Sequence, residues 1–279
     1  MNAFKQLLQH PTRGVDAHPR ASHQRVPLGT WIMSASPLVA EAIGHAGFDW
    51  AVLDMEHSPL ELPGVVALLQ ALASTKLVPI VRLAGNDPVL FKRVLDAGVS
   101  TLMVPRVQGA EEAERAVAAL RYPPLGHRGA AAMSRATRYG TQRLDTAAAN
   151  AAVALIAQLE TPQALEALER IAAVEGVDAL FIAPADLSAA MGHGGDARHP
   201  AVMRAMSQAA ERARAAGLPI GTLAGTPEMA AQVRAAGFDF VGLGSDLGLL
   251  VHAAQASLQA LRTPDAAMVH SLNLGTHAY

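Results

Sequence analysis

Short runs of β-branched and other apolar residues alternate along the chain with longer stretches rich in alanine and leucine. Eight such runs occur, and each is followed by a stretch that predicts a helix. The predicted strands lie at 27–33, 49–54, 77–83, 100–105, 153–160, 178–184, 218–224 and 239–244. Predicted helices include 87–97, 110–120, 162–172 and 227–236. This repeated strand–helix order is typical of an α/β protein with a parallel sheet.

A recurring phrase precedes several of the predicted strands. It reads "AGFD" at 46–49 and again at 236–239, "AGVS" at 97–100 and "EGVD" at 175–178. The glycine supplies the left-handed residue that ends a helix before the next strand begins. Eight units in about 250 residues predict a (β/α)8 TIM barrel. A doubly wound sheet is the alternative, but no predicted strand is followed by a G-x-G-x-x-G turn.

The repeat also divides the chain. We expect the barrel domain to occupy residues 26–262, with a longer insert at 121–148. Residues 1–25 are predicted to form an N-terminal extension, and residues 263–279 a mobile C-terminal tail.

Composition narrows the functional class. Hydrophobic residues make up 51% of the chain and charged residues 16%, so a large core can be buried. No apolar run reaches the roughly 20 residues of a membrane span, and the N-terminal segment lacks the apolar core of a signal peptide. We therefore expect a cytoplasmic protein without a membrane partner.

The chain has no cysteine, which excludes disulfides, thiolate zinc sites, iron–sulfur clusters and a cysteine nucleophile. Any metal ion must be held by oxygen or imidazole ligands. The net charge is −2 and the basic residues are scattered, so nucleic acid is not an expected partner.

Polar residues gather where the predicted strands end, and these ends carry the chemistry of a (β/α)8 barrel. The residues at these ends are Asp54, Glu56, His57, Arg82, Arg106, Gln158, Glu160, Asp186, Ser188, Thr222, Ser245 and Asp246.

Glu160 and Asp186 each follow an apolar strand, where a lone buried carboxylate would be costly without a partner. A cation between the two would explain them, whereas helix capping is the alternative. Capping is the weaker interpretation for Glu160, because Thr161 precedes Pro162 and can cap that helix itself. Two carboxylates, with water and substrate oxygens, suit Mg²⁺ or Mn²⁺ better than a closed zinc site.

Arg82 lies inside an apolar strand, where its permanent charge needs an anion. This anion can be a structural carboxylate, from Glu56 or Asp54. It can equally be the carboxylate or the enolate of a substrate. A single histidine such as His57 is usually a packed or solvated residue. Asp54, three positions earlier, can orient the ring, which predicts an acid–base dyad. The "HRGAAAMSRATR" loop at 127–138 either binds an anion or is a solvated insert.

Several phrases in order resemble the HpcH/HpaI aldolase family, the class II pyruvate-dependent aldolases of 4-hydroxy-2-oxo acids. They include "GFDWAVLDMEHSPLE", "RYPPLGHRG", "QLETPQAL" and "VEGVDALFIAPADLSAAMG", and the resemblance covers residues 26–262. Malyl-CoA lyases and citrate lyase β-subunits are more distant relatives. The "RYPPLGHRG" and "EHSPLE" phrases resemble the simple-acid aldolases better.

The resemblance implies roles for individual residues. Glu160 and Asp186 match the metal ligands, with Mg²⁺ or Mn²⁺ expected and Co²⁺ or Zn²⁺ possible. His57, Asp54 and Arg82 match the catalytic histidine, its partner and the strand arginine. Residues expected to line the substrate site are Gln158, Pro184, Ala185, Trp31 and Leu223.

Two further points follow from the resemblance. Asp96 matches an aspartate that reaches a neighbouring subunit's site, which implies a homo-oligomer, usually a hexamer. Ala183 stands where the family has glycine, and we expect its methyl group to affect the substrate range more than the reaction type.

The resemblance and the polar strand ends together predict a metal-dependent lyase that cleaves a 4-hydroxy-2-oxo acid to pyruvate and an aldehyde through a pyruvate enolate. No lysine stands at a strand end, which disfavours a Schiff-base aldolase. A CoA-ester lyase of the same superfamily and a non-catalytic barrel are the alternatives. The sequence does not identify the aldehyde.

Overall fold

The computed structural model describes residues 1–9 and 26–262. The predicted tail, 263–279, and residues 10–25 of the predicted N-terminal extension lie outside the described residues. No helix in the described parts is both long enough and apolar enough to cross a lipid bilayer.

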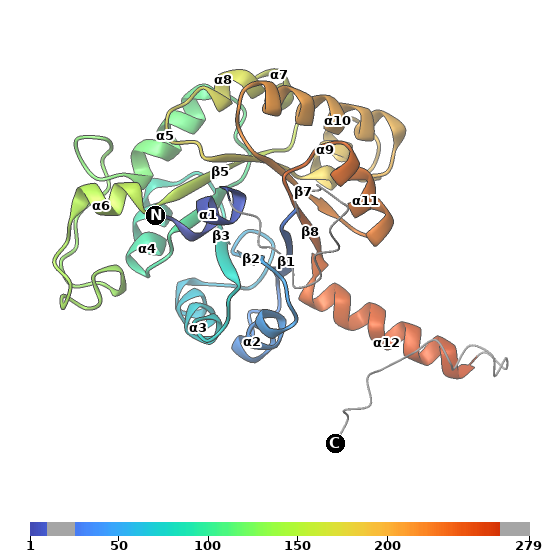
Figure 1. The fold of residues 1–279 in the computed structure, drawn as a ribbon, viewed down its shortest axis with the longest axis horizontal. Helices are drawn as coiled ribbons and strands as arrows, with labels where there is room; N and C mark the ends of the chain where they lie inside the picture. Colours follow the sequence, from blue (N-terminus) through green and yellow to red (C-terminus); the bar gives the residue numbers. More distant parts are fainter. Residues whose placement is uncertain (10–25, 263–279) are drawn as a thin grey trace, which may run out of the picture.

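Eight parallel strands close into a barrel in chain order, with β8 paired to β1, and the prediction of a (β/α)8 barrel is confirmed (Figure 1). The strands are β1 (Leu28–Ile32), β2 (Trp50–Asp54), β3 (Val78–Arg82), β4 (Thr101–Val104), β5 (Ala154–Leu159), β6 (Ala179–Ile182), β7 (Ile220–Ala224) and β8 (Phe240–Ser245). Each strand bound differs from its predicted position by two residues at most.

Twelve α-helices accompany the strands in the described residues, and most of them cover the outside of the barrel (Figure 1). They are α1 (Ala3–Gln9), α2 (Pro37–His45), α3 (Leu62–Leu72), α4 (Pro88–Asp96), α5 (Ala110–Leu120), α6 (Thr146–Ala151), α7 (Pro162–Glu166), α8 (Leu168–Ala172), α9 (Pro184–Ala190), α10 (Pro200–Ala215), α11 (Pro227–Ala235) and α12 (Asp246–Arg262), with a 3-10 turn at Arg135–Thr137. The helix predicted at 162–172 is divided at Ala167, whose ψ of 2° departs from helical geometry.

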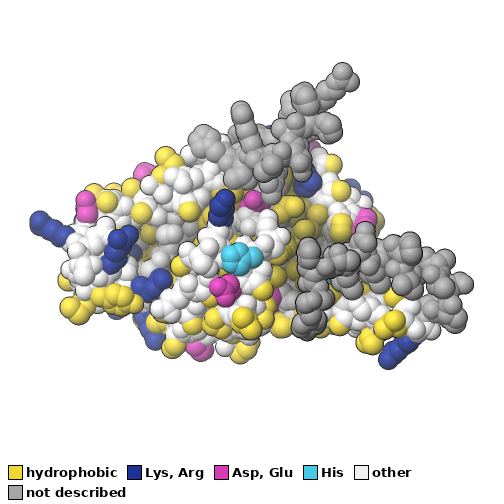
Figure 2. Space-filling model, turned by 60° about the horizontal axis from the view of Figure 1, so that its bottom comes forward, with side chains coloured by type: hydrophobic (Ala, Val, Ile, Leu, Met, Phe, Trp, Pro, Cys, Tyr) yellow, Lys and Arg dark blue, Asp and Glu magenta, His cyan; other side chains and the backbone are white. Residues whose placement is uncertain are grey.

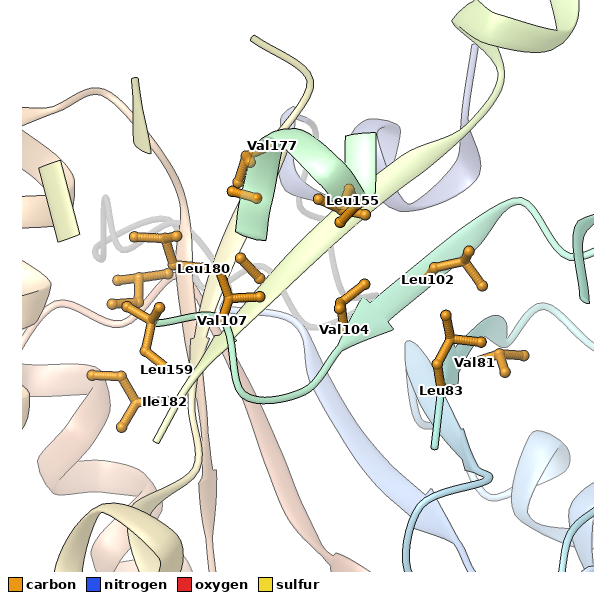
Figure 3. Close-up of a cluster of buried hydrophobic side chains, with 14 of the residues drawn as sticks. Val81, Leu83, Leu102, Val104, Val107, Leu155, Leu159, Val177, Leu180 and Ile182 are labelled. Carbon is orange, nitrogen blue, oxygen red and sulfur yellow. The ribbon is translucent and has the colours of Figure 1, made fainter. Parts of the chain in front are cut away.

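Alternate residues of each strand point into the barrel or outward to the helices, which produces two cores. The outer core is aliphatic, and Figure 3 shows part of it, where Leu102, Leu155 and Leu180 come from neighbouring strands. The inner core is aromatic, with Trp31, Trp50, Phe181 and Phe240 among its buried members (the last two ring centroids are 6.0 Å apart).

Glycine makes room for these rings. A Cβ atom at Gly29 would lie 2.1 Å from Trp50, and one at Gly221 would lie 2.3 Å from Phe240. Any side chain at either glycine would therefore displace an inner aromatic ring.

Helix α1 closes the amino-terminal end of the barrel. Phe4 is fully buried and meets the ring of Phe240 edge-on at 5.2 Å. The Asn2 side chain donates hydrogen bonds to the carbonyl oxygens of Ser100 (2.9 Å) and Ala152 (3.0 Å). The predicted N-terminal extension thus begins with a helix that packs into the barrel floor.

The aspartates of the recurring phrase tie neighbouring strands together at this same end. Asp49, Asp178 and Asp239 each accept a hydrogen bond from the backbone N–H at or near the start of the preceding strand, at 2.8, 2.9 and 2.9 Å. Lys5 of α1 also pairs with Asp178 at 2.7 Å. These contacts explain why three of the four copies of the phrase end in aspartate, which the sequence pattern had left unexplained.

Helix α12 differs from the other helices. It runs away from the barrel after its first turns (Figure 1), and Asp246 is its buried residue. Its exposed apolar residues are Leu247, Leu249, Leu250, Val251, Leu258 and Leu261.

Candidate active site

A cavity of about 460 Å³ opens at the carboxyl ends of the strands, the end at which (β/α)8 enzymes carry their chemistry. Its lining includes His57, Arg82 and Asp186, together with Trp31 and Leu223. On the face shown in Figure 2, hydrophobic side chains form a hollow bordered by a histidine, acidic side chains and a basic one. The predicted polar residues of several strand ends therefore meet in one place.

Arg82 is held by two carboxylates. Asp54 and Arg82 are the last residues of β2 and β3 and lie directly opposite each other in the sheet. The arginine Nε and Nη2 atoms donate to the two Asp54 oxygens at 2.8 and 2.7 Å. Its Nη1 lies 3.1 Å from Glu56 Oε2, so both predicted structural partners are present.

This arrangement keeps the guanidinium in a fixed orientation at the cavity wall. Arg82 is 7% exposed and Asp54 is fully buried. A guanidinium has five N–H donors, so its terminal nitrogens retain donors for a ligand oxygen after these contacts.

The Asp54 carboxylate accepts hydrogen bonds from Arg82 and from backbone amides. The predicted contact between Asp54 and the imidazole of His57 is not formed. Its Oδ1 accepts from the backbone N–H of Glu56 at 3.0 Å and of His57 at 3.4 Å. The His57 ring is 58% exposed, and its Nε2 lies 3.8 Å from Glu56 Oε2. The bidentate pair with Arg82 is the stronger interaction, so it determines where the Asp54 carboxylate points.

Glu160 lies at the end of β5 and is buried. Its Oε1 accepts hydrogen bonds from the Gln158 side-chain amide and, at 3.4 Å, from the backbone N–H of Arg106. Arg106 adopts a φ of 57°, the left-handed region that is costly for a non-glycine residue. Thr161 caps the next helix through the Ala164 N–H, so Glu160 does not serve as that cap.

Acidic groups crowd this end of the barrel. Burial raises the pKa of Glu160, and the negative charges of Glu56 and Asp186 raise it further. Burial also raises the pKa of Glu56, although Arg82 and His57 oppose the shift. A bound cation would relieve the repulsion among the carboxylates of Glu56, Glu160 and Asp186.

The donor set fits a hard divalent cation with open coordination positions. Buried Gln158 Oε1 has no hydrogen-bond partner, and it belongs to the same residue that contacts Glu160. Within residues 1–9 and 26–262, no three or more Asp, Glu or His side chains form a ready-made metal cage. Two carboxylates completed by water and substrate oxygens suit Mg²⁺ or Mn²⁺.

The remaining predicted lining residues lie around the cavity. Trp31, Pro184, Ala185 and Leu223 all contribute to its wall. The Arg82 guanidinium carbon lies 6.0 Å from the centre of the Trp31 ring, a cation–π contact.

Ala183 also lies on the cavity wall. Its φ of −88° is accessible to any residue, so the departure from glycine causes no backbone strain. The methyl group of Ala183 therefore changes only the shape of the cavity wall.

Asp96 does not line this cavity. Its Oδ1 accepts a hydrogen bond from Arg128 Nη2 at 2.8 Å, and the same guanidinium stacks over the Tyr122 ring at 4.4 Å. Arg128 is 6% exposed, so this arginine of the 127–138 loop is a packed residue and not a solvated one.

The sequence indicated only some residues of the outer part of the cavity. Leu243 and the predicted Ser245 of β8 line it, together with Leu249 and His252 of α12, which the sequence did not indicate. A signal was present, since Ser245, Leu249 and His252 are spaced as one helical face.

Comparison with known proteins decides the family. The sequence model of the family described as HpcH/HpaI aldolase/citrate lyase matches residues 28–253 of this chain. The chain belongs to the HpcH/HpaI aldolase/citrate lyase family. The predicted family resemblance is thereby confirmed.

Relatives within this family are named aldolases. The chain is 49% identical to 2-dehydro-3,6-dideoxy-6-sulfogluconate aldolase of Pseudomonas putida, over 86% of this chain and 94% of the relative. It is 46% identical to pyruvate aldolase of Rhizobium etli, over 82% and 90%. A crystal structure of a family protein from Burkholderia cenocepacia superimposes with a TM-score of 0.86 at 38% identity, covering 94% of this chain and 100% of that one.

Proposed function

We propose that this protein is a divalent-metal-dependent aldolase that cleaves a 4-hydroxy-2-oxo acid to pyruvate and an aldehyde. The observation that carries the proposal is that Asp186 and the fixed guanidinium of Arg82 line one cavity, with the carboxylates of Glu56 and Glu160 close enough to interact with them. The aldolase names of the relatives support the reaction class.

The difficult part of this reaction is the negative charge that develops on the pyruvate half when the C3–C4 bond breaks. Glu160 and Asp186 would hold the cation, which when bound supplies Lewis-acid stabilisation of that charge. Arg82 binds an oxygen of the same half through its remaining N–H donors. Asp54 positions Arg82, which replaces its predicted role as the partner of the His57 ring.

His57 is the proposed general base. It lines the cavity, and its Nε2 takes the proton of the C4 hydroxyl as the C3–C4 electron pair moves to C3. The C4–O bond becomes the aldehyde carbonyl, and the aldehyde leaves first. The enolate then takes a proton from water at C3 to give pyruvate, and the imidazolium of His57 returns its proton to the hydroxide that is left. Glu56 Oε2 lies 3.8 Å from His57 Nε2.

The test is pyruvate release from a panel of 4-hydroxy-2-oxo acids, with EDTA-treated protein and with added Mg²⁺ or Mn²⁺. We expect turnover only with the metal. Metal-independent turnover contradicts the mechanism. Cleavage of malyl-CoA in place of the free acids would establish a CoA-ester lyase, and no turnover together with no metal binding would favour a non-catalytic barrel.

We also propose that the protein is a homo-oligomer. The apolar residues on α12 support this, because leucines such as Leu250 (64% exposed) and Leu261 (83%) would be buried by a second copy. Sedimentation analysis tests it, with a monomer as the contradicting result. Whether Asp96 acts at a neighbouring site, as the resemblance implies, is tested by mixing inactive His57→Ala and Asp96→Ala protomers, which should restore activity.

A further inference from the structure

The loop between β4 and α5, residues 105–109, is hydrogen-bonded to the end of β5. The backbone N–H of Arg106 donates to Glu160 Oε1 at 3.4 Å. The next N–H along the chain, that of Val107, donates to the carbonyl oxygen of Gln158 at 3.1 Å. Two consecutive peptide groups of this loop therefore hold the two polar residues at the end of β5.

The Glu160 carboxylate receives its hydrogen bonds on one oxygen. Among the described residues, the Gln158 side-chain amide and the Arg106 N–H both donate to Oε1, and none donates to Oε2. Because a carboxylate is planar and rigid, two donors on Oε1 also determine where Oε2 points. Oε2 is thus the oxygen left to ligate a cation.

The backbone conformation that makes this contact is a costly one. Arg106 has a φ of 57°, and a non-glycine residue stays in this region only when its surroundings hold it there. The Arg106 side chain is exposed, and it forms no ion pair or hydrogen bond with the described residues. The turn must therefore be held by the residues that follow it.

Two anchors follow the turn. Val107 is fully buried in the outer core (Figure 3). Gln108 Oε1 accepts a hydrogen bond from Thr161 Oγ1 at 2.6 Å, and its backbone N–H donates to Glu112 Oε2 at 2.5 Å. Thr161 directly follows Glu160, so the Gln108 side chain joins the loop to the residue next to the carboxylate.

The sheet itself does not depend on the contact between Gln108 and Thr161. The ladder between β4 and β5 pairs Thr101 with Ala154 and ends with Val104 beside Ala157, before this contact is reached. Loss of the Gln108 side chain should therefore leave the barrel closed and act on the loop alone.

Resting on the proposed aldolase function, we propose that Gln108 is a positioning residue for the cation site. Its hydrogen bond with Thr161 keeps the Arg106 N–H against Glu160 Oε1 and so sets the direction of Oε2. Gln108 is not among the described residues that line the cavity, so it acts through Glu160 and not on the substrate.

The test measures Mn²⁺ binding to EDTA-stripped protein by electron paramagnetic resonance. Gln108→Leu keeps the size of the side chain but removes the acceptor for Thr161. We expect its Kd for Mn²⁺ to rise by about tenfold, the lower end of the loss that follows when groups supporting metal ligands are removed. A wild-type Kd in the folded variant would overturn the proposal. Gln108→Ser, whose side chain is too short to reach Thr161, replaces it if the leucine variant does not fold.

Two control variants separate positioning from a general effect on this region. Gln108→Glu keeps an acceptor for Thr161 and should bind Mn²⁺ at least as tightly as the wild type. Gln163→Leu makes the same change in the first turn of α7, where the exposed side chain has no hydrogen bond with the described residues, and should leave the Kd unaltered. Equal weakening in Gln163→Leu and Gln108→Leu would contradict the proposal.

Exchange of the pyruvate methyl protons with D₂O, followed by NMR, separates this inference from the function on which it rests. Wild-type exchange and Mn²⁺ binding, together with unaltered binding in Gln108→Leu, would overturn the inference alone. Neither exchange nor Mn²⁺ binding in the wild type would overturn the aldolase function itself.

Discussion

Both ends of this barrel carry acidic residues, but the two sets are arranged in opposite ways. At the amino-terminal end, Asp49, Asp178 and Asp239 are spread around the rim, and each accepts a hydrogen bond from a backbone N–H. At the carboxyl end, burial and the charges of Glu56 and Asp186 raise the pKa of Glu160, and burial and the charges of Asp54 and Asp186 raise that of Glu56.

The difference separates stability from function. A carboxylate paired with a backbone N–H joins two strands and strengthens the fold. Carboxylates that repel one another destabilise the metal-free protein, and under the proposed function they are retained because they bind a cation. The predictions below test this division, from the largest expected effect to the smallest.

Replacing Glu160 by glutamine should have the largest effect on activity. The variant keeps the shape of the side chain but loses the charge for the cation, so pyruvate formation should fall on the order of a thousandfold. Its metal-free form should unfold at the same or a higher temperature than the wild type, because repulsion from Glu56 and Asp186 is relieved. A lower unfolding temperature would place Glu160 with the structural acids.

Replacing His57 by alanine should leave metal binding intact while cleavage falls by about 100-fold or more, the usual contribution of a general base. The exposed ring makes few packing contacts, so the fold should be unaffected. Metal titration and single-turnover cleavage give the two readouts. Equal loss of metal binding in His57→Ala and Glu160→Gln would mean that His57 is a ligand.

At the opposite end, Asp239→Ala should lower the free energy of unfolding by about 1–3 kcal/mol, because the Ile220 N–H loses its acceptor, while kcat stays unchanged. Asp239→Asn is the matched control, since its amide oxygen can keep this bond. Chemical denaturation measures both variants. Loss of activity with unaltered stability would contradict the division between the two ends.

Burial raises the pKa of Asp239, which gives the Asn control a pH signature. The folded chain holds this proton more tightly than the unfolded chain does. Wild-type stability therefore rises as the pH falls from neutral through the raised pKa, and the Asn variant should lack this part of the rise.

The smallest effect is expected on the exposed outside of the barrel. Hydrogen bonds from Arg212, at 2.6 and 2.5 Å, lower the pKa of Glu169 to about 2. Its stabilisation is present above the ordinary pKa and is lost as the pH falls toward 2. Glu169→Gln should cost at most about 1 kcal/mol at pH 7, because solvent screens surface pairs. A larger cost, measured by denaturation, would show that the pair does more than a surface contact.

Sequence periodicity was enough to predict the barrel, since the eight strands lie close to their predicted ranges. It also predicted that residues from β2, β3 and β6 would meet, because parallel strands bring their carboxyl ends together. Periodicity could not predict which carboxylate Arg82 would pair with. That choice depends on the register that places Asp54 opposite Arg82, which is a property of the folded sheet.

The side of the cavity formed by α12 was missed for a different reason. Its residues come from the start of this helix, and apolar residues such as Leu249 resemble ordinary helix-face residues in the sequence. The floor formed by α1 was likewise not apparent from the pattern, because a short helix at a chain end carries little periodic signal.

The central claim is that the carboxyl-end acids form a cation site, and the most direct measurement is Mn²⁺ binding to EDTA-stripped protein, followed by electron paramagnetic resonance. The wild type and Asp239→Asn should both bind Mn²⁺ tightly, whereas Glu160→Gln should bind it at least about tenfold more weakly. Equal binding by all three proteins, or no binding by the wild type, would contradict the account.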